Sequence, residues 1–94
     1  MKDVSKFVGK TRYSIDDLVE ILKILRSPEG CPWDREQDHK SIRRDFLEEC
    51  YEAIEAIDTD DTALLREELG DVLLQVVFHS EIECERGHFD LPMS

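Results

Sequence analysis

The sequence predicts an all-α fold, a small helical bundle whose core helices are completed by homo-oligomerisation. Apolar residues recur at helical spacing in three separate segments, and no segment alternates apolar and polar residues as a half-buried strand does. Helix-starting and helix-ending residues stand between these segments. The 94 residues are expected to form a single domain, residues 1–94. A chain this short buries little of its own surface, which favours an oligomer.

The first predicted helix spans residues 15–26. Ser14 precedes it as a capping residue, and Asp16 and Asp17 place negative charge at the positive end of the helix dipole. Residues 1–13 have no clean period, so we expect an irregular arm there. Residues 27–32 contain two prolines and a glycine, which end the helix and begin a connection running to residue 39.

Two further helices follow this connection. Residues 41–57 carry one apolar stripe at 3.6-residue spacing, and a polar turn at residues 58–62 separates them from a third helix at residues 63–86. Gly87 is the expected C-cap of that helix. The stretch from Leu69 to Phe78 is apolar on almost every face, so we expect it to be largely buried. A three-helix monomer is not expected to cover it, and this favours a homodimer or a dimer of dimers.

The overall charge excludes several classes of partner. The chain has 12 basic and 23 acidic side chains, a net charge of −11, which argues against nucleic acid and against an anionic membrane surface. No apolar run is long enough for a transmembrane helix, and the first residues lack the apolar segment of a signal peptide. The three cysteines form no C-x-x-C pair, which favours free thiols and a cytoplasmic protein.

The negative charge is concentrated in the second half of the chain. Residues 1–47 hold ten basic and nine acidic side chains, whereas residues 48–94 hold two basic and fourteen acidic ones. One interpretation is a solvated acidic face. The other is a cation site, because grouped carboxylates with few counter-charges gain most from a bound metal.

Spacing favours a cation site for four of these acids. Glu49 and Glu52 share one side of the second helix, and Glu68 and Asp71 are i, i+3 neighbours within the apolar part of the third. Burying two unpaired carboxylates is costly, and Arg66 points away from them. Antiparallel packing would bring the two pairs together as an oxygen cage for Mg²⁺, or Mn²⁺ in its place. The helix-weakening Gly70 suggests close approach of a helix or ligand. For Glu55 and Glu67 we prefer solvation or ion pairing.

Three longer blocks of sequence give a resemblance to a known family. They are residues 25–34 (LRSPEGCPWD), residues 47–57 (LEECYEAIEAI) and residues 67–79 (EELGDVLLQVVFH). Together with the pattern E-E-x-x-E followed by E-x-x-D, they resemble the MazG proteins among the all-α nucleoside triphosphate pyrophosphohydrolases. The resemblance covers residues 15–91.

The resemblance implies an enzyme that hydrolyses a nucleoside triphosphate to the monophosphate and pyrophosphate with Mg²⁺. Glu49, Glu52, Glu68 and Asp71 would be the metal ligands, with Glu48 assisting them or the attacking water. Metal ions would neutralise the triphosphate and lower the pKa of that water. The alternative is a catalytically silent MazG-like module for nucleotide binding or oligomerisation.

Other residues are candidates for binding the substrate. Trp33 is expected either to stack on the base or to pack its loop onto the bundle, and Asp34 either to contact the nucleotide or to cap a helical turn. MazG domains usually continue after residues 89–91 into a helix with basic residues that hold the triphosphate, and that helix is absent before Ser94. The chain is therefore expected to be a truncated form, to use basic residues such as Lys40, or to have weak activity.

Two histidines are not expected to be ligands. We interpret His79 as a core histidine or one that supports the site from behind the ligands. Cys31 and His39 lack the two further partners that a zinc site needs.

Overall fold

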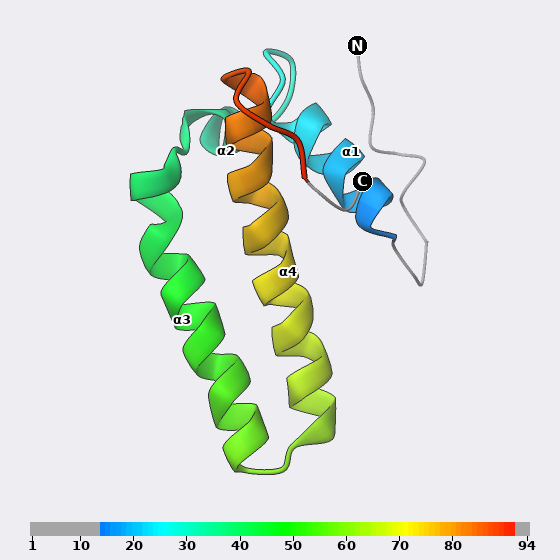
Figure 1. Cartoon of the computed structure of the whole chain (residues 1–94), viewed down its shortest axis with the longest axis vertical. Coiled ribbons are helices and arrows are strands. Elements are labelled where there is room, and N and C mark those ends of the chain that lie inside the picture. Colours follow the sequence, from blue (N-terminus) through cyan, green and yellow to red (C-terminus); the bar gives the residue numbers. More distant parts are fainter. Residues whose placement is uncertain (1–13, 92–94) are drawn as a thin grey trace.

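The all-α prediction is confirmed by a computed structural model, which describes residues 14–91. It has four helices and, within these residues, no strand: α1 (Ile15–Leu25), α2 (Pro32–Glu36), α3 (His39–Asp58) and α4 (Thr62–Glu85). The two long helices run antiparallel as a hairpin, and α1 lies beside the upper part of α4 (Figure 1). The arm predicted at residues 1–13 lies outside the described residues.

The helix ends follow the capping signals of the sequence. Ser14 and Asp17 form a reciprocal capping box at α1, and Asp38 forms one with Ser41 at α3, which therefore begins two residues earlier than predicted. Asp61 caps the start of α4 through the backbone N–H of Leu64. The C-cap of α4 is Arg86, one residue before the predicted Gly87. Gly87 follows it with φ +76°, a left-handed conformation that glycine adopts without strain, and so ends the helix.

The short helix α2 was not predicted. It lies in the segment expected to be an irregular connection and begins at Pro32, where the missing N–H of proline costs no helical hydrogen bond. Gly30, just before it, lies against the end of α1: a Cβ there would stand 2.2 Å from the carbonyl oxygen of Ile24. The connection is therefore packed closely against α1.

The hydrophobic core lies at the end of the hairpin that α1 covers. Its buried members come from α1, α3, α4 and the last described residue: Leu22, Ile42, Val77, Phe78, Ile82 and Leu91. Leu73 and Val76 pack against this cluster. The single chain thus buries Val77, Phe78 and Ile82, whereas Leu73 and Val76 are partly exposed and Leu69 and Leu74 are exposed. It covers part of the apolar surface of α4 and leaves the part near Leu69 uncovered, as expected of a monomer.

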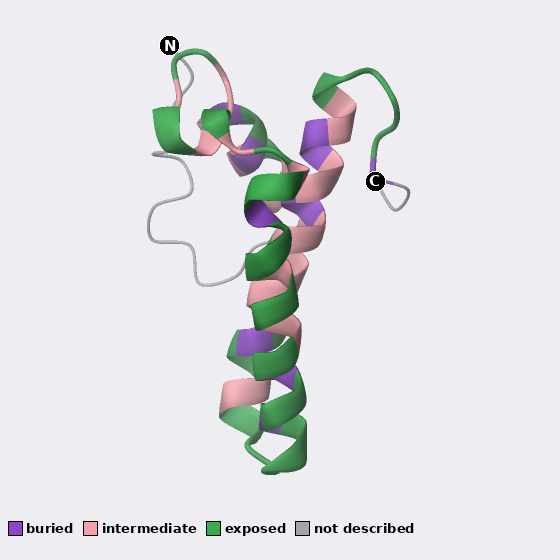
Figure 2. Cartoon of the chain, turned by 90° about the vertical axis from the view of Figure 1, so that its left-hand side faces the viewer, coloured by how far each residue is buried: buried purple, intermediate pink, exposed green. Residues whose placement is uncertain are grey.

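The other half of the hairpin has little core. Its buried apolar side chains are Ala53 and Ala56, which are small enough to let the two helices approach closely. Large apolar side chains there are about half exposed instead: Leu47, Tyr51, Ile54, Ile57 and Leu69. The lower part of the hairpin is accordingly mostly in the colour of exposed residues in Figure 2. Gly70 is also exposed, and apart from its chain neighbours and the backbone of its own helix no described atom lies within 4 Å of a Cβ placed on it. No other described helix therefore approaches Gly70, and the alternative of a ligand there stays a prediction.

Two sequence expectations concern the chain as a whole. Cys31, Cys50 and Cys84 are free thiols, as predicted. Within residues 14–91, none of the helices combines the length and the apolar character needed to cross a membrane.

Candidate metal centre

Three carboxylates from α3 and α4 converge in the lower half of the hairpin. They are Glu49 of α3 and Glu68 and Asp71 of α4, and we call them the carboxylate cluster. One oxygen of each lies within 4.8 Å of an oxygen of each of the others. The geometry follows from the fold, because a tight turn at residues 59–61 makes the helices antiparallel and i, i+3 spacing puts Glu68 and Asp71 on one face.

The carboxylates of the cluster repel one another. Burial raises the pKa of Glu68 to about 7, helped by the neighbouring Glu52 carboxyl and then by Asp71 and Glu49. Burial also raises the pKa of Glu49, with smaller contributions from Asp71 and Glu52. Among the described residues, no ion pair with a basic side chain includes a member of the cluster. The negative charge here is uncompensated by protein.

Two oxygens of the cluster have no partner. Glu49 Oε2 and Glu68 Oε2 are buried and make no hydrogen bond in the described structure. Buried polar atoms are normally paired, so this arrangement lacks a positively charged group. Carboxylate oxygens are the ligands of hard divalent cations such as Mg²⁺ and Mn²⁺, and the donor set therefore fits such an ion.

Comparison with known proteins identifies the family. Residues 37–93 match the MazG nucleotide pyrophosphohydrolase domain. The chain belongs to this family. It is 58% identical over 76 residues to the nucleoside triphosphate pyrophosphohydrolase/pyrophosphatase MazG of Thermotoga maritima, covering 81% of this chain and 30% of that protein. It is 51% identical over 77 residues to the nucleoside triphosphate pyrophosphohydrolase of Escherichia coli K12, covering 81% of this chain and 29% of that protein. The chain thus spans less than a third of the length of these relatives.

The other predicted acids lie around the cluster of this MazG domain. Glu52 is exposed and outside the group of three, although it is close enough to raise the pKa values of Glu49 and Glu68. Glu48 faces solvent and pairs with Arg44 at 3.6 Å. Glu55 and Glu67 are exposed, in line with the solvation expected for them.

The residues expected to bind the nucleotide lie at the other end of the hairpin. Trp33 is 61% exposed on α2, so it does not pack the loop onto the bundle of this chain. Asp34 lies within α2 and caps no helix, because the N-caps of α2 and α3 are Cys31 and Asp38. Lys40 is exposed near the start of α3. At 1.5 Å per residue, the start of α3 lies about 15 Å along the helix from Glu49.

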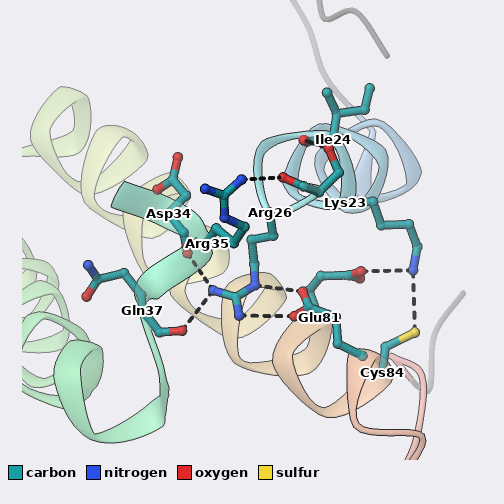
Figure 3. A network of polar contacts seen from close by, with 10 residues as sticks. Lys23, Ile24, Arg26, Asp34, Arg35, Gln37, Glu81 and Cys84 are labelled. Atoms are coloured by element: carbon teal, nitrogen blue, oxygen red, sulfur yellow. Dashed lines mark hydrogen bonds and ion pairs between the residues drawn. The ribbon is translucent and has the colours of Figure 1, made fainter. Parts of the chain in front are cut away.

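One arginine, Arg26, holds α2 in place, and its role was not predicted from the sequence. The buried Arg26 side chain makes a two-point ion pair with Glu85 at 2.6 and 3.1 Å (Figure 3). Its Nη1 donates to the carbonyl oxygens of Asp34 at 2.6 Å and Gln37 at 2.9 Å. The guanidinium also lies 5.3 Å from the centre of the Phe78 ring. Arg26 thus joins α1, α2 and α4 at one point.

A second polar network joins α3 to α4 at the same end. His39 Nδ1 lies 2.6 Å from His79 Nδ1, and His39 Nε2 lies 2.5 Å from Glu83 Oε1. His88 bonds the other oxygen of Glu83. His39 is thus engaged within the protein, and His79 is a half-buried histidine of the helix interface, as predicted.

Proposed function

We propose that this MazG domain hydrolyses a nucleoside triphosphate to the monophosphate and pyrophosphate with Mg²⁺, with Mn²⁺ as a possible substitute. The observation that carries the proposal is the carboxylate cluster, with its unpartnered oxygens and its lack of basic neighbours. An acidic pocket can bind an anionic triphosphate only when cations stand between them. The names of the relatives support the same reaction.

In this proposal Glu49, Glu68 and Asp71 hold the metal, and Glu52 completes the set from the exposed side of α3. Bound Mg²⁺ would supply Lewis-acid activation and a water of lowered pKa. The carboxylates would hold the ion between the two helices. Glu48, on the solvent-facing side of α3 beside Glu49, supports the ligands or orients the attacking water. Lys40 and its basic neighbours on α3 add positive charge that attracts the anionic substrate, and Trp33 and Asp34 are proposed contacts of the nucleotide.

We also propose that the protein is a homodimer or a dimer of dimers. The support lies in the exposed apolar side chains of the lower hairpin, which include Leu47, Tyr51 and Ile54 at helical spacing on α3. A second copy is the proposed occupant of this surface, and light scattering at micromolar concentration would then give at least twice the chain mass of 11.0 kDa. No nucleic acid or membrane is a proposed partner. The free cysteines support a cytoplasmic location.

The deciding experiment is incubation with each common nucleoside triphosphate and Mg²⁺, followed by measurement of pyrophosphate. Asp71→Asn should abolish both the product and the rise in melting temperature on adding Mg²⁺, because ligand binding stabilises only the folded state. Glu67→Gln is the matched control, since it removes an exposed acid from the same helix and should keep both. A folded, oligomeric parent protein that releases no pyrophosphate from any nucleotide would instead support the catalytically silent module.

A further inference from the structure

The buried polar atoms without a hydrogen-bond partner among the described residues lie on the two long helices. In residues 14–91, the buried side-chain oxygens and nitrogens without a hydrogen bond are Glu49 Oε2, Glu68 Oε2, Gln75 Oε1 and His79 Nε2. All four belong to α3 or α4. Two lie in the carboxylate cluster, and the other two continue along α4, since Asp71, Gln75 and His79 follow one another at i, i+4 spacing on one face. The features that point to a ligand therefore extend beyond the cluster.

The His79 ring is held in a fixed orientation. It is stacked on His39 with ring centres 4.9 Å apart and planes 7° from parallel, and Phe46 lies 5.4 Å from it. Its Nδ1 is occupied by His39 at 2.6 Å. Only Nε2 is left for another partner, and a side chain held in this way has already lost the freedom that binding would otherwise cost.

The network also determines which hydrogen bond Nε2 can make. Hydrogen bonds from His39 and His88 lower the pKa of Glu83, so this group is a carboxylate and accepts from His39 Nε2–H. At a pH where both imidazoles are neutral, His39 Nδ1 is then an acceptor and receives the proton of His79 Nδ1. Burial lowers the pKa of His79, which favours its neutral form. In this form His79 Nε2 is an acceptor, as Gln75 Oε1 is in every form.

We propose that Gln75 and His79 form the nucleoside-binding part of this site, accepting hydrogen bonds from donor groups of the nucleoside. The proposal rests on the proposed function, which puts the phosphates at the carboxylate cluster. Side chains on a helix lean toward its N-terminus, so His79 leans toward Gln75 and Gln75 toward Asp71. Each step in this row covers about one helical turn of 5.4 Å. The two steps from Asp71 to His79 together are comparable to the distance from an α-phosphate through its sugar to the base.

Two acceptors one helical turn apart favour a ligand with two donors. The hydroxyls of a ribose and the N–H groups of a base share this chemistry. Both residues are half-buried, and the carboxamide of Gln75 turns about a soft terminal bond, which lets its oxygen reorient toward a donor. A site built from acceptors discriminates strongly against a substrate that lacks the donor, because the acceptors then stay unpaired.

The test separates the nucleoside from the phosphates. The Mg²⁺-loaded protein is titrated by calorimetry with an α,β-methylene nucleoside triphosphate, which resists cleavage, and with inorganic tripolyphosphate. Gln75→Leu and His79→Gln should each weaken binding of the nucleotide about tenfold, the effect of one lost hydrogen bond to a buried partner, and leave tripolyphosphate unchanged. His88→Gln is the control, because it removes an exposed histidine from the same network without touching the helix interface.

The parent protein gives a second readout that needs no variant. The ¹⁵N resonance of His79 Nε2 should shift on adding the nucleotide and stay in place on adding tripolyphosphate. Ribo- and 2′-deoxyribonucleotides, and different bases, then show which donor is bound. Equal weakening of both ligands by the variants, or an unmoved resonance, would overturn the inference while leaving the proposed function intact. A parent protein that binds neither ligand with Mg²⁺ overturns both.

Discussion

The two halves of the α3–α4 hairpin are built differently. At the upper half, α1 and residues 87–91 cover the helices, and the buried side chains are large and apolar. Two ion pairs also join α1 and its C-cap residue to α4: Lys23 pairs with Glu81 at 3.0 Å, and Arg26 pairs with Glu85. The lower half has no such cover among the described residues, and its buried groups are two alanines and Glu68.

This difference separates stability from chemistry. The upper half supplies the burial of apolar surface that stabilises a chain of this size. The lower half contains carboxylates that raise one another's pKa values, and it exposes the apolar side chains that form the proposed contact surface for a second copy. A site with uncompensated charge can be held in this fold because the helices that carry it are anchored at their other end.

The largest effect should come from the core of the upper half. Phe78→Ala is expected to lower the free energy of unfolding by about 3–5 kcal/mol, since it removes a large buried side chain and leaves a cavity. Ile54→Ala, in the lower half, should change the stability of the single chain by less than about 0.5 kcal/mol. Urea denaturation at several protein concentrations separates single-chain stability from assembly. Similar losses at both positions would contradict the division into halves.

A smaller effect is expected at the anchor of α2. Arg26→Ala should cost about 1–3 kcal/mol, because the carbonyls of Asp34 and Gln37 lose a charged donor. Trp33 is the single tryptophan of the chain, so its fluorescence anisotropy should fall as α2 loosens. Arg35→Ala is the matched control, since the side chain of this exposed arginine bonds, within residues 14–91, the carbonyls of Ser27 and Pro28 and no residue of α4. Unchanged anisotropy in Arg26→Ala would show that α2 is held by other contacts.

A third effect concerns the pH dependence of the stability of the lower half without metal. The pKa of Glu68 is about 7 in the folded protein and 4.5 ordinarily, so between these values the folded state binds more protons than the unfolded state. The stability of the metal-free protein should therefore fall as pH rises from 4.5 through 7. Glu68→Gln should flatten this part of the profile and raise the melting temperature at pH 8. A parent profile that rises over the same range would show that the carboxylates are compensated.

The parts that could be predicted depend on local signals. Ser14, Asp61 and Gly87 set helix ends through contacts a few residues away, and the i, i+3 spacing of Glu68 and Asp71 places them on one face whatever the tertiary structure. The convergence of Glu49 on that pair then follows from one tight turn.

The parts that were missed depend on distant pairs. Arg26 contacts Glu85, 59 positions away, and His39 contacts His79, 40 positions away. Neither contact can be predicted from the periodic spacing of residues within one helix. The helix α2 was missed for the same reason, because Arg26 bonds the carbonyl of Asp34 within it and that of Gln37 at its end. The burial of α4 was overestimated at Leu69, because its apolar pattern does not reveal how far α1 extends.

The turn between the long helices has a consequence for the order of folding. It spans residues 59–61, with Asp60 at φ 55°, and it joins two helices whose contacts begin a few residues apart at the turn and can then extend outward from it one turn at a time. Contacts between near neighbours form faster than those that close long loops, so we expect the hairpin to pair before α1 docks on α4. A newly made chain would thus assemble its carboxylate cluster first and acquire its stabilising core afterwards. During that interval, a divalent cation in the surrounding solution would act as an aid to folding.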